Sequence, residues 1–227
     1  MKKLCLCLVI SLSLLPTATM AVSTTANQAV VTRLKSKGDA EINRRLTSLD
    51  TLTNLINSAT KLSASDKSSL ASQVSDETSG LHTLKTKLDS DTDITTTRTD
   101  IQAIFSDYRV YALILPKVRI LVADDHIAVT SVRLSDLVTK LNDKITAKAS
   151  SMSTASLEGQ LAQMQTDIAN ANNLYTSIHD ATINLQPSDY NTDHTILIGK
   201  RDQLNQAATD LRDALADAKS IITSLSS

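Results

Sequence analysis

Four aspartates near the middle of the chain have the spacing of a calcium-binding loop. Asp89, Asp91 and Asp93 alternate along the sequence, and Asp100 lies eleven residues after the first of them. Hard cations such as Ca²⁺ bind several carboxylate oxygens, and this spacing matches four ligand positions of a calcium loop. The match is incomplete, because Ile94 occupies the position that needs glycine. The alternative that we favour is a solvated linker in which Asp91 or Asp93 caps the following helix.

A second chemically distinctive segment is the block from Phe105 to His126, which holds three of the five aromatic residues and the densest apolar run. We favour a buried kink near Pro116, with the tyrosine hydroxyl groups bonded to neighbouring polar groups. The alternative is an exposed apolar patch for a partner or a membrane. Lys117 and Arg119 interrupt the apolar run, which argues against insertion into a membrane. The interaction candidates in this block are Tyr108, Arg109 and Tyr111.

The histidines show no spacing that is typical of a metal site. None of the four is paired as His-x₃-His. The runs Asp124-Asp125-His126 and His179-Asp180 offer mixed ligands, but adjacent residues on a helix do not face each other, so surface histidines are expected. The chain also lacks a G-x-S-x-G elbow, a phosphate-binding loop and an H-E-x-x-H motif. We therefore predict no enzyme, and no cofactor other than Ca²⁺ at the aspartate segment.

The composition excludes several other classes of protein. The 227 residues include four glycines, no tryptophan, four tyrosines and one phenylalanine. A doubly wound nucleotide-binding fold needs more glycine, and β-sandwiches and barrels favour aromatic and β-branched strands. The net charge of −1 provides no basic surface for nucleic acid.

The first residues have the features of an export signal. Lys2 and Lys3 precede the apolar run Leu4–Leu15, which is too short to span a bilayer, and Pro16 ends this run. Thr19-Met20-Ala21 fits a small-residue cleavage site, so we expect a signal peptide at 1–21 and one mature domain at 22–227. Cleavage removes both cysteines and leaves no transmembrane anchor. The expected location is secreted, periplasmic or in the cell envelope.

Apolar residues recur at helical spacing throughout the mature chain. The clearest rows alternate by four and three residues, as in coiled coils. One row runs from Leu157 to Leu185 and another from Leu70 to Leu88, with Glu77 as a member of the latter. The C-terminal row consists of Leu197, Arg201, Leu204, Ala208, Leu211, Leu215, Ala218, Ile222 and Leu225.

Turn signals divide these rows into helices. We expect one helix over about Thr24–Leu62 and a second that carries the Leu70–Leu88 row and ends at about Asp89. A shorter helix should run through Ile101 to Phe105, and a long helix should cover about Pro116–Ala149. Gln186-Pro187-Ser188-Asp189 is expected to end one helix and to start the next, which gives an antiparallel hairpin. The predicted fold is all-α: an elongated bundle of about five to six helices with coiled-coil-like heptad seams.

Three stretches together resemble a family of uncharacterised exported bacterial proteins that are helical throughout. They are Leu88–Asp93, which contains the D-x-D-T-D linker, Ile104–Asp125, which contains the D-Y-R-V-Y…P motif, and the run Pro187-Ser188-Asp189-Tyr190-Asn191. The resemblance covers most of the mature chain and implies an exported helical protein. It also implies that the Tyr108, Arg109 and Tyr111 block is a feature of the family. It carries no activity or ligand.

These observations predict a non-enzymatic exported helical bundle that acts as an interaction or structural protein of the cell envelope or the extracellular space. Its partner is an unidentified protein or envelope component. The alternatives are a Ca²⁺-binding protein that uses the Asp89–Asp100 segment, and a lipid- or membrane-active bundle that opens along its helix seams.

Overall fold

The computed structural model describes residues 18–150 and 153–226, and within these ranges every regular element is a helix. The predicted all-α class is therefore confirmed. The predicted signal segment up to residue 17 lies outside the described residues, and the expected cleavage position after Ala21 lies within the first helix. The elements are α1 (Ala18–Ser58), α2 (Ala64–Ser90), α3 (Ile94–Ser106), the π-helix η1 (Val110–Ile114), α4 (Leu115–Lys148), α5 (Ala155–Thr182), α6 (Pro187–Thr192) and α7 (Lys200–Ser226).

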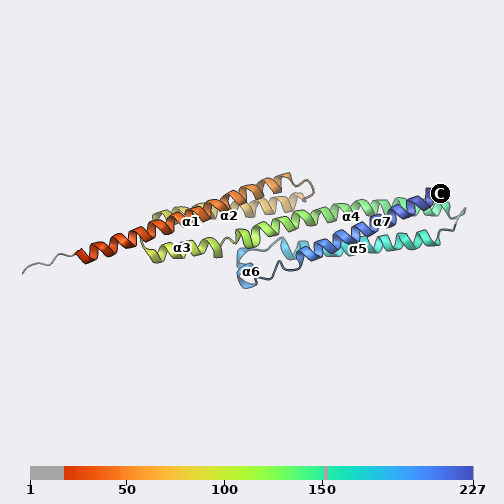
Figure 1. Cartoon of the computed structure of the whole chain (residues 1–227). Coiled ribbons are helices and arrows are strands. Elements are labelled where there is room, and N and C mark those ends of the chain that lie inside the picture. Colours follow the sequence, from red (N-terminus) through yellow and green to blue (C-terminus); the bar gives the residue numbers. More distant parts are fainter. Residues whose placement is uncertain (1–17, 151–152, 227) are drawn as a thin grey trace, which may run out of the picture.

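The molecule is an elongated rod made of two groups of helices that overlap near its middle (Figure 1). The first group packs α1 against α2 and α3, and the second packs α4, α5 and α7 against one another. Helices α3, η1 and α4 follow one another along the rod, so α4 connects the two groups. Each group has its own apolar cluster, and along α4 the first cluster ends at Leu121 and the second begins at Ile127.

Side chains in the predicted linkers start the helices by binding their free N–H groups. Ser63 Oγ accepts a hydrogen bond from the backbone N–H of Asp66 at 3.1 Å, which caps α2. Asp93 Oδ1 accepts hydrogen bonds from the N–H groups of Thr95 and Thr96 at 2.8 and 2.9 Å, which caps α3. The prediction that Asp91 or Asp93 caps the next helix is thus confirmed for Asp93.

Two of the predicted apolar rows are buried as expected. The row of α2 is buried along its whole length, including Glu77, and the row of α5 is buried from Leu157 to Thr182 apart from Tyr175. The row predicted for α7 is confirmed at Leu211 and Ala218, which are buried, and is wrong at Leu215 and Ile222, which remain 41% and 45% exposed. The buried face of α7 is rotated toward Ala207, Ala214 and Ile221.

Helix α4 begins at Leu115, within one residue of the start predicted at Pro116, and the chain breaks earlier, at Arg109 before η1. Arg109 adopts a left-handed backbone conformation with φ of 41°, and the chain then enters the wide turn of η1. The N–H of Leu115 bonds the carbonyl of Val110, five residues earlier. Pro116 follows at the start of α4, directly after η1, and it has no N–H group to donate to a carbonyl of the preceding turn. Helix α4 ends at Lys148, within one residue of the prediction.

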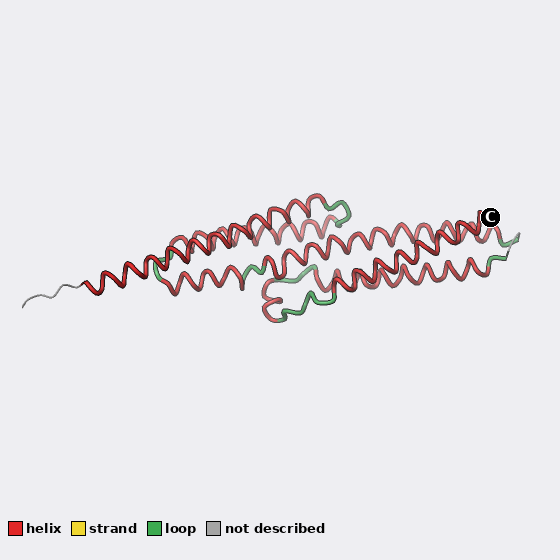
Figure 2. The backbone as a smooth tube through the Cα atoms, viewed as in Figure 1, coloured by secondary structure: helices red, strands yellow, loops and turns green. Residues whose placement is uncertain are grey.

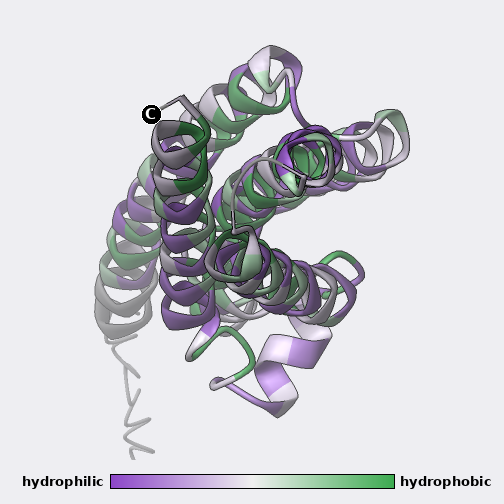
Figure 3. Ribbon diagram, turned by 90° about the vertical axis from the view of Figure 1, so that its right-hand side faces the viewer, coloured by the Kyte–Doolittle hydropathy of each residue, from purple (hydrophilic) through white to green (hydrophobic). Residues whose placement is uncertain are grey.

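The connection between α5 and α7 is longer than predicted. The Pro187 segment forms only the short helix α6, and the next long helix begins at Lys200, so Leu197 of the predicted row lies outside it. Asp189 Oδ2 accepts a hydrogen bond from the N–H of Gln186 at 2.8 Å, which closes a capping box. Figure 2 shows this connection and the loop before η1 near the middle of the rod, and Figure 3 shows α6 at its side in hydrophilic colours.

None of the described helices combines the length and the apolar character that crossing a membrane requires.

Candidate functional site: an ionisable seam between the two helical groups

Buried ionisable residues lie on α4 where the two apolar clusters meet. Asp124 and Asp125 fall between Leu121 and Ile127, the neighbouring members of the two clusters. Asp124 is 1% exposed, and neither of its carboxylate oxygens has a hydrogen-bond partner in the described structure. Asp125 is also buried, and its Oδ2 is unpartnered. Unpaired buried carboxylates are costly when ionised, so these residues mark an unusual site.

Burial changes the protonation of both carboxyl groups. Loss of hydration raises the pKa of Asp124 to about 7; the adjacent Asp125 also raises it, and His179 and Lys200 oppose this rise. The pKa of Asp125 rises to about 6, again mainly through burial and then through the charge of Asp66. Both groups consequently exchange protons near neutral pH, as general acids, general bases and pH sensors do.

His179 of α5 connects this acidic pair to α2. Its Nε2 lies 3.2 Å from Asp66 Oδ1, close enough for an ion pair, and its Nδ1 lies 3.2 Å from Asp180 Oδ1. Burial lowers the pKa of His179, but the hydrogen bonds and charges of Asp180 and Asp66 outweigh burial and raise the pKa overall. His179 is only partly exposed, at 23% of its side chain, because Asp66 of α2 lies against its ring.

A second part of the seam surrounds Lys117, which is 1% exposed. Its ammonium group donates hydrogen bonds to Gln73 Oε1 at 2.7 Å and to the carbonyl of Leu185 at 2.9 Å. Burial lowers the pKa of Lys117 to about 8, while the charges of Asp189 and Glu77 act in the opposite direction. Lys117 thus ties α4 to α2 and to the loop that follows α5.

Glu77 of α2 completes this second part. It is 8% exposed, its Oε2 is unpartnered, and burial followed by the charge of Asp76 raises its pKa to about 7. The positive charge of Lys117 lowers this pKa but does not overcome burial. Glu77 also borders a polar cavity of about 360 Å³ that is lined largely by serine, glutamine and asparagine side chains. The seam therefore holds several groups that take up or release protons close to neutral pH.

The four aspartates of the predicted calcium segment have separate roles. Asp93 is occupied as the α3 cap, Asp100 is buried and accepts a hydrogen bond from Lys87 Nζ at 2.7 Å, and Asp89 lies 3.6 Å from Lys85 Nζ. Asp91 is buried, and its pKa is raised by burial and by the charge of Asp100. In the part of the chain that the structure describes, no group of three or more histidine, cysteine or acidic residues is placed to hold a metal ion. The calcium loop is thus not assembled in this structure.

The three interaction candidates face different parts of the molecule. Tyr108 packs over Gly80 of α2, where an added Cβ would come within 2.6 Å of the tyrosine ring. Arg109 Nε donates a hydrogen bond to Asn191 Oδ1 at 2.6 Å, and its guanidinium group lies 5.5 Å from the centre of the Tyr190 ring. Tyr111 is 46% exposed. The D-Y-R-V-Y and P-S-D-Y-N stretches, which are distant in sequence, therefore meet at α6.

We expect replacement of Arg109 to separate backbone strain from lost contacts. Arg109→Ala keeps a side chain in the left-handed region and removes the bonds to α6, so it should destabilise the protein by about 1–3 kcal/mol. Arg109→Gly loses the same contacts but relieves the strain, and should recover about 0.5–1 kcal/mol of this loss. Urea unfolding of the two variants checks the order. A glycine variant less stable than the alanine variant would contradict the strain at Arg109.

The seam residues were only partly recognisable in the sequence. Glu77 occupies an apolar position of the α2 row, and the apolar run of α4 is interrupted by Lys117, Asp124 and Asp125. A charged residue at an apolar position is the usual sign of a buried charge. No spacing rule connects Lys117 with Gln73 or Asp66 with His179, because each pair joins separate helices.

Comparison of the chain with protein-family models, curated proteins and solved structures found no match.

Proposed function

We propose that this protein is an exported, non-enzymatic helical bundle that binds a protein partner in the cell envelope or the extracellular space. The observation that carries the proposal is a half-exposed aromatic pair, Phe105 and Tyr111, which are 44% and 46% exposed. They are two of only five aromatic residues in the chain. Large exposed aromatic side chains on a predominantly aliphatic bundle are typical of a contact surface.

The two rings are held in place by a buried arginine. The guanidinium group of Arg45 in α1 lies 4.6 Å from the centre of the Phe105 ring and 5.1 Å from that of Tyr111. Arg45 is itself buried, and its Nη1 pairs with Glu41 Oε2 at 2.7 Å. A stack of an arginine with two aromatic rings is rigid, and rigid aromatic and arginine side chains contribute most to binding at protein interfaces.

Several polar residues of the seam favour a binding role over catalysis. Lys117 is occupied by two hydrogen bonds, and His179 lies between two aspartates. These contacts hold α2, α4 and α5 together. The side chains are thus engaged in contacts between helices, whereas an enzyme would present such groups to a substrate.

The proposal is tested with the double variant Phe105→Ser/Tyr111→Ser. Because both rings are half-exposed, we expect the variant to fold, with a loss of about 1–2 kcal/mol from the arginine stack. Partner capture from envelope and culture fractions, quantified against the wild type, should fall about tenfold or more. Val132→Ser is the matched control, since Val132 is 63% exposed on α4 and lies outside the stack. If the double variant captured as much of the partner as Val132→Ser does, the assignment of the Phe105 and Tyr111 surface as the binding surface would be contradicted.

Export and the absence of catalysis need separate tests. Intact-mass measurement of the protein from culture medium and cell fractions should show a chain that begins after Ala21, and retention of the full mass in the cytoplasm would contradict export. Turnover of a hydrolase or oxidoreductase substrate, lost when one seam carboxylate is replaced, would contradict the non-enzymatic role.

A further inference from the structure

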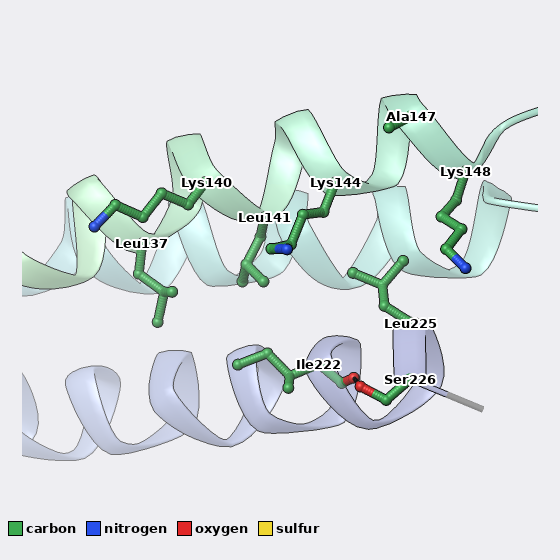
Figure 4. Close-up of a pocket in the computed structure, with 9 residues that line it drawn as sticks. All are labelled: Leu137, Lys140, Leu141, Lys144, Ala147, Lys148, Ile222, Leu225 and Ser226. Carbon is green, nitrogen blue, oxygen red and sulfur yellow. Dashed lines mark hydrogen bonds between the residues drawn. The ribbon is translucent and has the colours of Figure 1, made fainter.

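A groove with apolar walls and a basic rim runs between α4 and α7 at the end of the rod farthest from α1 (Figures 1 and 4). Its volume is about 500 Å³, which is within the range of small-molecule sites in proteins. Figure 4 shows Leu141 of α4 and Leu225 of α7 pointing into the space between the two helices. The groove is lined by Leu137, Lys140, Leu141, Lys144, Ala147, Lys148, Ile222, Leu225 and Ser226.

The apolar wall on α7 belongs to the row that the bundle leaves uncovered. Ile222 is 45% exposed although it occupies a heptad position, and Leu215, seven residues earlier on the same face, is 41% exposed. Contact with an apolar ligand would remove this surface from water, which is the main driving force for binding of hydrocarbon chains.

The rim on α4 is positively charged. Lys140, Lys144 and Lys148 are four residues apart, so they lie on one face of the helix, above the apolar wall (Figure 4). Lys140 and Lys144 enter no ion pair with a described residue. Like charges at this spacing repel one another, and an anion placed between them would relieve this repulsion.

We propose that this groove binds a single-chain anionic amphiphile, such as a long-chain carboxylate. The hydrocarbon chain lies against Leu141, Ile222 and Leu225, and the anionic head group binds the ammonium groups of Lys140 and Lys144. Charge complementarity selects the head group, and the apolar walls select the chain. The groove is separate from the Phe105 and Tyr111 surface, so this proposal is independent of the proposed protein partner.

The probe is parinarate, a naturally fluorescent long-chain carboxylate, titrated into the purified mature protein. We expect saturable binding that is about tenfold weaker in Lys140→Gln/Lys144→Gln, because each variant position loses a charge-assisted contact. Parinaryl alcohol, which lacks the charge, should bind the wild type and this variant equally. Ile222→Ser should weaken both probes, and it should fold because Ile222 is half-exposed.

The matched control is Arg212→Gln/Lys219→Gln, which removes two exposed positive charges from α7 outside the groove and should bind parinarate as the wild type does. Equal parinarate binding by the two double variants would overturn the proposal, as would no saturable binding at all. Two other results would also overturn the proposal in favour of a different occupant. If the protein bound anionic vesicles and parinarate did not compete with them, the occupant would be a membrane surface. If parinarate did not bind and the protein self-associated in a way that Ile222→Ser abolished, the occupant would be a second copy of the chain.

Discussion

Replacement of Asp124 with asparagine is expected to raise the melting temperature at about pH 8 and to raise it much less at about pH 5. Asp124 is 1% exposed, and both of its oxygens lack a hydrogen-bond partner. Its ionised form is therefore a cost to the folded state, and asparagine removes the charge while keeping the shape of the side chain.

The sign follows from proton binding. The folded chain holds the proton of Asp124 up to about pH 7, whereas the unfolded chain releases it near 3.8. The folded state thus binds more protons between these values, and the free energy of unfolding falls as the pH rises through this interval. A pKa that is raised by about three units corresponds to a cost on the order of 4 kcal/mol above about pH 7. Since asparagine also needs hydrogen bonds, we expect a gain of about 2–4 kcal/mol.

The neighbouring groups change stability in the same direction over this range. Asp125 and Glu77 also have raised pKa values, of about 6 and about 7, so each contributes stability at low pH that is lost as the pH rises from the unfolded value of its pKa to the raised one. The raised pKa of His179 means that its favourable charge is present below the ordinary value of 6.5 and is lost as the pH rises through the raised value. The wild type should accordingly melt at a higher temperature at about pH 5 than at about pH 8.

Thermal unfolding monitored by circular dichroism at several pH values across this range checks both expectations. Asp136→Asn is the matched control, because Asp136 is an exposed aspartate of the same helix, and its replacement should shift stability by less than about 0.5 kcal/mol at either pH. If Asp124→Asn lowers the melting temperature at about pH 8, the carboxylate is held by a cation such as Lys200 and the seam does not destabilise the folded protein at high pH.

Much of the fold could be predicted because helices are specified by local patterns. The rows of α2 and α5 have a regular spacing of apolar residues, and Ser63 and Asp93 mark helix starts through the chemistry of their side chains. The rotation of α7 could not be predicted in the same way. Its apolar residues cover a broad stripe, and the burial of Ala207 and Ala214 in place of Leu215 depends on how closely α5 approaches.

The candidate site was harder to predict, because it is formed by the overlap of two helical groups. The sequence indicates that Glu77 and Lys117 interrupt apolar segments, but their proximity depends on where the α1–α2 hairpin lies along α4. The start of α4 at Pro116 could be predicted, whereas the break at Arg109 could not, for a related reason. Proline is a strong local signal, whereas a left-handed arginine is held by tertiary contacts with Asn191 and Tyr190.

Replacement of Lys117 with methionine is expected to destabilise the protein by about 1–3 kcal/mol at about pH 7.5, because the acceptors that it leaves unpaired cost more than is gained by removing a buried ammonium group whose pKa is lowered. Methionine preserves most of the volume but removes the donor that serves Gln73 Oε1 and the carbonyl of Leu185. It also removes the positive charge that lowers the pKa of Glu77, so Glu77 becomes more costly to ionise. The loss should therefore be smaller at about pH 5.5, where Glu77 is protonated with or without Lys117.

The double variant Glu77→Gln/Lys117→Met isolates the electrostatic part of this effect. If Glu77 and Lys117 are coupled across the seam, the second substitution should restore about 1–2 kcal/mol at about pH 7.5 and remove the extra pH dependence, which urea unfolding at both pH values measures. Arg119→Met is the control, since Arg119 is exposed on the same helix and its loss should change stability by less than about 0.5 kcal/mol. A loss in Lys117→Met that is independent of pH and unaffected by Glu77→Gln would assign the role of Lys117 to its two hydrogen bonds alone. In that case the acidic pair on α4 would be the main pH-dependent part of the seam.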